Sequence, residues 1–220
     1  MAFDTTPVAV GPSRWSLPQS AEWPIDDIVA TGADLEPSTL IDAYRHGLFP
    51  MHVGDDDILA WWSPVLRGII DLDSLRITRS MRRSAKRYRC TIDESFDDVI
   101  AACAEVPRGG KWINDDMVSA YRTLHRLGWA HSVETWLDDE LVGGLYGVRI
   151  DRFFAGESMF HTRTDASKVA LMHLVDTMRR ENMMLLDVQW VTPHLSTLGA
   201  LEIPRDAYLR RLSSAIDPIV

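Results

Sequence analysis

The sequence predicts an α+β fold in which helices pack against a mostly antiparallel sheet. Three consecutive strand-like segments, 131–137, 141–150 and 152–158, are separated by short turns, which is the pattern of an antiparallel meander. An amphipathic segment over 165–181 is long enough for a helix, and an apolar strand at 185–190 follows it. A row of strands, then helix, strand and helix, is the layout of the α+β class.

The first seventy residues predict an arm and a small domain. Residues 1–24 are rich in Pro, Ser and Thr, so we expect a flexible N-terminal arm. A helix is expected over 35–47, because a proline lies near its start and a glycine at its end. The segment 58–72 is strand-like and is broken by Pro64. These elements would form a small N-terminal domain over 25–70.

Residues 71–220 predict a second, larger domain that contains the meander. Its other helices are expected, in chain order, at 95–106, 114–128, 194–198 and from 204 onward. Asn114 and Asp115 would begin the second of these, and Asp165 would cap the long helix after the meander.

Composition excludes several classes of protein. The 220 residues are 46% hydrophobic and 25% charged, as in an ordinary globular protein. No apolar run reaches the ~18 residues of a membrane helix, and the N-terminus lacks the basic and apolar regions of a signal peptide. Two cysteines give neither a disulfide framework nor a metal site. We therefore expect a cytoplasmic protein that does not bind membranes.

One segment is strongly basic although the net charge is −9. Residues 76–89 hold seven of the 23 Lys and Arg residues and no acid. In a helix that begins near residue 78, four of them would share one face: Arg79, Arg82, Arg83 and Lys86. Two interpretations are equally favoured, a solvated helix face paired with surrounding acids and a contact with nucleic-acid phosphates.

Three polar residues interrupt apolar strands. Glu157 ends one strand directly after Gly156, which would permit close approach of a substrate. Asp187 and Gln189 lie two apart in the next strand, so they should share a face opposite Leu186, Val188 and Trp190. A single such residue is usually exposed or caps local amides. Three on neighbouring strands predict a site, because buried polar groups need partners.

The sequence carries no motif for several other common chemistries. The seven histidines have no metal-ligand spacing, and there is no phosphate-binding loop of the Walker type and no nucleophile elbow. "LVGGLYG" lies inside a strand, so it does not fit a dinucleotide fingerprint. Gly143, Gly144 and Gly147 should instead be places where the sheet bends or accepts a neighbour.

Several segments together resemble one family: "YRHGLFP", "WWSP", "GKWI", "AHSVETW", "LVGGLYGV", "GESMF", "ASKVAL", "DVQ" and "HLSTLGALEIPR". From Thr31 to Leu212 the chain is similar to leucyl/phenylalanyl-tRNA–protein transferases. The resemblance implies a GNAT-like (acyl-N-acyltransferase) catalytic domain over 71–220. It also implies transfer of Leu or Phe, and less efficiently Met, from aminoacyl-tRNA to an N-terminal Arg or Lys of a protein. The resulting peptide bond would mark that protein for N-end rule degradation. No cofactor and no metal are implied, and a monomer is expected.

The resemblance also assigns residues. Its catalytic residues fall on Glu157, Asp187 and Gln189. The tryptophan that stacks on the terminal adenosine falls on Trp112, and a substrate-binding phenylalanine falls on Phe154. The amino-acid pocket would be lined by Leu145, Met159, Leu174, Met178 and Leu186.

The chain departs from the family pattern at several positions. Met51 replaces an aromatic residue expected near the tRNA 3′ end, and His161 replaces a serine. "GKWI" and "WWSPVLR" also differ from the family's segments. The basic stripe Arg79, Arg82, Arg83 and Lys86 would contact the tRNA.

In this interpretation Asp187 and Gln189 line the acceptor-amine site, where Asp187 polarises the Gln189 amide and the amide orients the incoming amine. Glu157 supplies negative charge near the cationic acceptor. Replacing Asp187 or Gln189 by Ala should then lower transfer strongly and leave the fold and tRNA binding nearly intact.

Two alternatives stay open. An acetyl-CoA-dependent N-acetyltransferase would share the fold, but its pyrophosphate loop needs glycines that "HTRTDASK" lacks. A non-catalytic tRNA-binding module would explain the basic stripe and leave the three polar residues without a role.

Overall fold

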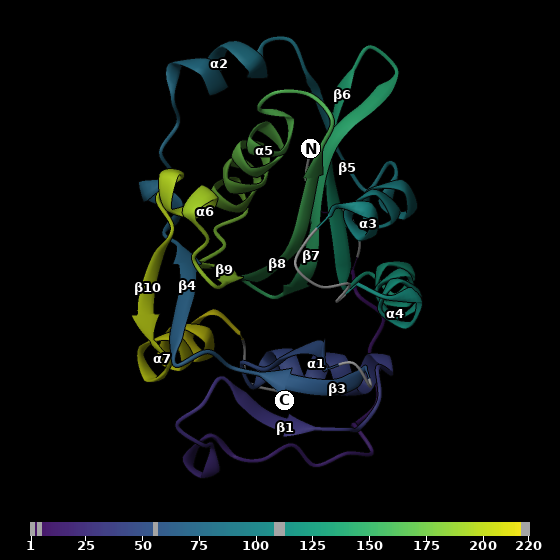
Figure 1. Cartoon of the computed structure of the whole chain (residues 1–220), viewed down its shortest axis with the longest axis vertical. Coiled ribbons are helices and arrows are strands. Elements are labelled where there is room, and N and C mark those ends of the chain that lie inside the picture. The colour runs from purple at the N-terminus through teal and green to yellow at the C-terminus, as the bar shows by residue number, and fades with distance from the viewer. Residues whose placement is uncertain (1–2, 4–5, 55–56, 108–112, 217–220) are drawn as a thin grey trace.

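Two β-sheets organise the chain (Figure 1). The computed structural model describes Phe3 and residues 6–54, 57–107 and 113–216. The smaller sheet is antiparallel, in the order β1–β3–β2, formed by Ile28–Thr31, Ile58–Trp62 and Phe49–Val53. The larger has the order β10–β4–β9–β8–β7–β6–β5, formed by Leu201–Pro204, Leu66–Ile70, Leu185–Gln189, Phe153–His161, Glu140–Ile150, Ala130–Leu137 and Arg89–Ile92.

Helices cover both faces of the larger sheet (Figure 1). They are α1 (Pro37–Arg45), α2 (Arg79–Ala85), α3 (Phe96–Glu105), α4 (Asp115–Arg126), α5 (Ala166–Arg180), α6 (Pro193–Thr197) and α7 (Arg205–Ala215). Two short 3-10 helices, η1 (Ser20–Glu22) and η2 (Leu72–Ser74), complete the described elements. α5 packs on one face and α3 and α4 on the other. The α+β class with a mostly antiparallel, helix-flanked sheet is thus confirmed. Within the described ranges, no helix has the length and apolar character needed to span a bilayer.

The expected helices and strands form, but four strands were not predicted: β1, β2, β5 and β10. Strand β10 is only four residues long, and it alternates between partly buried Leu201 and Ile203 and exposed Glu202 and Pro204. The predicted cap of α5 is wrong: Asp165 occupies the N-cap position, but its side chain accepts no hydrogen bond from the helix amides. Its backbone is left-handed at φ 63°, which turns the carboxylate away from the helix toward α2.

The predicted strand region at 58–72 divides at Pro64 into strands of different sheets. β3 pairs within the small sheet, whereas β4 pairs with β9 and β10 of the large one. The expected boundary near residue 70 therefore falls after a strand of the larger sheet.

The N-terminal arm has little regular structure but makes specific contacts. Val8 forms a backbone hydrogen bond to Leu127, and Trp129 Nε1 donates to the Val8 carbonyl. Phe3 is buried between Phe154 and His131. Apolar side chains thus tie the described part of the arm to the larger sheet.

Glycines in β7 accept close neighbours, as predicted. A Cβ on Gly143 would come within 2.6 Å of Ala166 at the start of α5. A Cβ on Gly147 would lie 2.4 Å from the ring of Phe154 and 2.1 Å from the Ala155 carbonyl oxygen. These glycines therefore set how closely α5 and β8 approach β7.

One parallel strand pair determines where a site can form. The connection from β8 through α5 to β9 makes these two strands the parallel neighbours of the sheet. Their pairing runs from Phe153 opposite Leu185 to Ala155 opposite Asp187 and ends there. Beyond this point β8 and β9 diverge, so side chains from 156 and 188 onward face a gap between them.

Candidate active site

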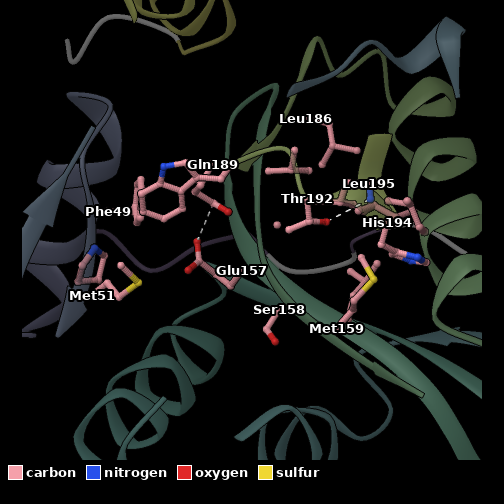
Figure 2. A pocket seen from close by; sticks show the side chains of 17 residues that line it. Phe49, Met51, Glu157, Ser158, Met159, Leu186, Gln189, Thr192, His194 and Leu195 are labelled. Carbon is pink, nitrogen blue, oxygen red and sulfur yellow. Dashed lines mark hydrogen bonds between the residues drawn. The ribbon is translucent and has the colours of Figure 1, made fainter. Parts of the chain in front are cut away.

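A pocket of about 310 Å³ lies where β8 and β9 diverge (Figure 2). Its apolar wall consists of Leu145, Met159, Leu171, Leu174 and Leu186. The opposite side carries Phe49, Pro50, Met51 and Trp190, so the small sheet contributes to the same pocket. Glu157 and Gln189 point toward one another between these two sides (Figure 2). The pocket thus combines an apolar chamber with a carboxyl–amide pair at its centre.

Two tyrosines hold the Glu157 carboxylate. Tyr44 from α1 donates its hydroxyl to Oε1 at 2.8 Å, and Tyr121 from α4 donates to Oε2 at 3.0 Å. The two hydroxyl oxygens are 2.5 Å apart. Burial, together with the nearby charge of Asp187, raises the pKa of Glu157 to about 7, against the lowering effect of both tyrosine hydrogen bonds. A carboxyl group with such a pKa can exchange a proton near neutral pH.

Gln189 reaches the pocket because its backbone leaves the strand conformation. Its φ of 56° is left-handed, and the β4–β9 register shifts beside it. The Gln189 amide Nε2 lies 3.5 Å from Glu157 Oε1, and its backbone N–H donates to Asp187 Oδ1 at 2.9 Å. No described residue donates to the Gln189 side-chain oxygen, so this oxygen can accept a hydrogen bond from a substrate amine.

Asp187 lies behind the pocket and is fully buried. The Arg67 guanidinium from β4 holds it through two hydrogen bonds, Nε to Oδ1 at 2.8 Å and Nη2 to Oδ2 at 2.6 Å. Tyr208 of α7 donates to Oδ2 at 3.0 Å. The expectation that Asp187 and Gln189 both line the amine site is therefore wrong for Asp187, because Gln189 turns away from regular strand geometry. Asp187 contacts Gln189 through the backbone instead.

Leu145, Gly156, Met159, Leu174 and Leu186 all line the pocket. Met178 does not: it is fully buried in the core, one turn of α5 beyond Leu174. The wall extends along α5 in the other direction, to Leu171.

Phe154 does not line the pocket either. It is fully buried, stacks on Phe3 with 5.7 Å between ring centroids, and fits against Gly147. It therefore supports the sheet beneath the site. Trp112 lies outside the described residues.

The four cations of the stripe, Arg79, Arg82, Arg83 and Lys86, are exposed on α2. None of them forms an ion pair with a described residue. A solvated helix face and a phosphate-binding face both require such exposure, and within 76–89 the structure shows an ion pair at Arg89, with Glu94. α2 lies at the end of the molecule opposite the small sheet (Figure 1).

Sequence reasoning missed the residues that hold the catalytic candidates: Tyr44, Tyr121, Arg67 and Tyr208. Arg67 had a signal, because it is the one base inside the apolar run "VLRGII", and a buried Asp needs a cation. No feature of the sequence marked the tyrosines, since each occupies an ordinary core position of its helix. Within the described chain, no group of three His, Cys, Asp or Glu side chains is placed to hold a metal ion.

Comparison with known proteins gives one consistent result. Residues 69–213 match the family described as leucyl/phenylalanyl-tRNA protein transferase, and residues 33–65 match its N-terminal domain. The transferase of Pseudoalteromonas atlantica is 46% identical over 193 residues, covering 86% of this chain and 82% of that one. The transferase of Aromatoleum aromaticum is 48% identical over 193 residues, covering 86% and 81%. That of Anaeromyxobacter sp. (strain K) is 45% identical over 211 residues, covering 94% and 90%.

Among solved structures, a tandem GNAT protein from the clavulanic acid biosynthesis pathway aligns with a TM-score of 0.39 and 14% identity. The alignment covers 86% of this chain and 59% of that one.

Proposed function

The chain belongs to the leucyl/phenylalanyl-tRNA–protein transferase family, and from this premise we propose that Glu157, Gln189 and Asp187 form its transfer site. The protein is an aminoacyltransferase that moves Leu or Phe from tRNA to proteins. The observation that carries the site assignment is the Glu157–Gln189 pair beside an apolar pocket.

The donor side chain occupies the apolar wall. Leucine and phenylalanine need a chamber without polar groups, and Leu145, Met159, Leu174 and Leu186 supply one. Methionine is deformable, so Met159 can adjust to either donor. Methionine as a slower donor is consistent with the same wall. Trp112 is proposed to stack on the terminal adenosine.

The acceptor amine lies between Gln189 and Glu157. An aminoacyl ester is already activated, so the site has to position the amine and remove one proton from it. The Gln189 side-chain oxygen orients the amine, and Glu157, with its pKa of about 7, takes the proton as the amine attacks the ester carbonyl. The peptide C–N bond forms, the C–O bond to the tRNA ribose breaks, and the ribose oxygen leaves with the proton that Glu157 returns. Its negative charge also favours a cationic acceptor, in line with an N-terminal Arg or Lys.

Asp187 acts as a positioning residue. Its Oδ1 accepts the Gln189 backbone N–H, and Arg67 fixes the carboxylate in place. This arrangement supports the left-handed backbone that aims Gln189 at Glu157. Asp187 therefore contributes through Gln189 and does not contact the amine.

The stripe on α2 binds tRNA phosphates. Exposed cations that no described acid neutralises favour a polyanion even on a chain with a net charge of −9. A location in the cytoplasm is proposed because substrates of this kind are found there. It acts as a monomer, since one chain supplies both the donor pocket and the amine site.

The test measures leucine transfer from Leu-tRNA to a peptide that begins with Arg. Glu157→Gln and Gln189→Ala should each lower kcat strongly, whereas Glu202→Gln and Gln19→Ala, at exposed positions, serve as controls. Acetyl-CoA as donor should give no labelled peptide. Near-normal turnover in Gln189→Ala would refute the assigned role of Gln189, and acetyl transfer would favour the acetyltransferase.

A further inference from the structure

A short loop between β8 and α5, residues 162–165, fastens the basic helix to the body of the protein. Asp165 Oδ2 accepts hydrogen bonds from Ser80 Oγ at 2.7 Å and Ser84 Oγ at 3.2 Å, both on α2. Just beyond α2, Tyr88 donates its hydroxyl to the Thr164 carbonyl at 2.9 Å. Ser80 and Ser84 are four residues apart, so they share one edge of α2, and Tyr88 contacts the same loop after the helix has ended.

The stripe lies on the other side of the same helix. Arg79, Arg82, Arg83 and Lys86 are exposed, while Met81 is buried in the core that α5 forms with the sheet. The contacts to Asp165 therefore decide which way the four cations face.

We propose that Asp165 is a positioning residue that holds the basic stripe of α2 in register with the transfer pocket. This inference rests on the proposed role of the stripe in binding tRNA. The proposal gives Asp165, whose backbone is left-handed, a role other than capping α5.

α2 needs such an anchor because it is short. A helix of seven residues is far below the ~12–15 residues at which an isolated helix becomes even marginally stable. Its own contribution to the core is Met81, and Thr78 caps its start through the Met81 amide. Without Asp165 the helix would sample several orientations, and ordering it on tRNA would cost binding free energy.

Asp165 is suited to this task in charge and in conformation. Lys168 Nζ donates to its Oδ1 at 2.9 Å, which leaves Oδ2 for the two serines. Ser80 and Lys168 together hold the pKa of Asp165 below its usual range, so it stays an acceptor at working pH. Aspartate and asparagine also tolerate a left-handed backbone better than other non-glycine residues.

The same geometry explains why the loop has no glycines. In the acetyltransferase alternative, this loop would present backbone amides to a pyrophosphate. Here it makes hydrogen bonds to α2 through the Asp165 side chain and the Thr164 carbonyl. The loop contacts the stripe's helix at the place where the alternative would bind a cofactor.

The experiment compares two donors, leucyl-tRNA and leucyl-adenosine, which has no stem to contact α2. Ser80→Ala with Ser84→Ala removes the hydroxyls and leaves α5 intact, and Ser213→Ala with Ser214→Ala, at two exposed positions of α7, is the matched control. Asp165→Gly removes the carboxylate and still permits φ 63°. Asp165→Asn keeps an acceptor oxygen and the backbone preference.

We expect the Ser80→Ala, Ser84→Ala variant and Asp165→Gly to raise the KM for leucyl-tRNA several-fold, with kcat unchanged and leucyl-adenosine unaffected. Asp165→Asn should lie between Asp165→Gly and the parent. Equal losses with both donors would overturn the inference, because Asp165 would then support the pocket or the fold in general.

A reference variant separates failure of this inference from failure of the proposed tRNA contact. Arg82→Glu with Arg83→Glu reverses two charges of the stripe directly. If it raises the KM for leucyl-tRNA and Asp165→Gly does not, the stripe binds tRNA without help from Asp165, and the inference falls alone. If Arg82→Glu with Arg83→Glu leaves the KM unchanged, the proposed role of the stripe falls, and the inference falls with it.

Discussion

The buried pair of Asp187 and Arg67 makes a prediction that differs from the one the sequence suggested. From the sequence, Asp187→Ala should lower transfer strongly and leave the fold nearly intact. In the structure both side chains are almost fully buried, and their ion pair is 2.6 Å long. Removing the carboxylate would leave the Arg67 guanidinium without its counter-charge inside the protein.

The expected cost follows from these contacts. Breaking a buried ion pair by removing one partner lowers the free energy of unfolding by about 3–5 kcal/mol. The Gln189 backbone N–H and the Tyr208 hydroxyl also lose their acceptor, which places Asp187→Ala at the upper end of that range. Since a domain is stable by roughly 5–15 kcal/mol, the loss is a large share of the total.

Urea unfolding followed by tryptophan fluorescence measures this cost. Asp206→Ala removes a carboxylate that pairs with Arg210 at 2.8 Å on the surface, so it is the matched control and should leave stability almost unchanged.

A double variant, Arg67→Met with Asp187→Leu, separates stability from transfer. It should recover most of the stability, because apolar residues of similar volume can replace a buried pair. It should remain inactive, because Gln189 has still lost the acceptor of its backbone N–H. If Asp187→Ala lowers the unfolding free energy by less than about 1 kcal/mol, or the double variant transfers leucine normally, the account of this pair is wrong.

Two further predictions concern the pocket. Because burial raises the pKa of Glu157 from 4.5 to about 7, the folded chain keeps a proton in this window that the unfolded chain has released, so Glu157 makes stability fall as the pH rises. Glu157→Gln should remove this part of the pH dependence, at most about 2 kcal/mol between pH 5.5 and 8.5 in urea unfolding, and an unchanged profile would contradict the raised pKa. The wall of Leu174, Leu186 and Met159 should accept Leu and refuse Ile, whose branch lies at Cβ, so comparable kcat/KM values for Ile-tRNA and Leu-tRNA would refute the donor assignment.

Much of the fold follows from local patterns in the sequence. The meander, the long helix and the helices at α1, α3 and α4 have apolar periodicity and end signals that depend on neighbouring residues only. Asp165 shows where this reasoning fails. An Asp before a helix usually caps it, but here a partner some 80 positions earlier, Ser80 and Ser84 of α2, competes for the carboxylate.

The candidate site was predictable as a set of residues but not as a geometry. Glu157 and Gln189 stood out because polar groups in apolar strands need a reason. Strand alternation then placed Asp187 beside Gln189, and only the left-handed backbone at Gln189 separates them. The residues next to Gln189 do not predict this left-handed conformation. It is supported through Asp187 by Arg67, which lies 120 residues before Asp187.

The Tyr44 contact ties the basicity of Glu157 to closure between the two sheets. Tyr44 belongs to α1, which precedes β2 of the small sheet, and the same region supplies Phe49 and Met51 to the pocket. If this region moved away, water would reach the carboxylate and the largest cause of its raised pKa would disappear. Glu157 would then return to an ordinary, weakly basic carboxylate. When α1 and the small sheet are closed against the larger sheet, they complete the wall of the pocket and raise the proton affinity of Glu157. An open protein would therefore lose both the donor pocket and the base, and it would be a poor catalyst.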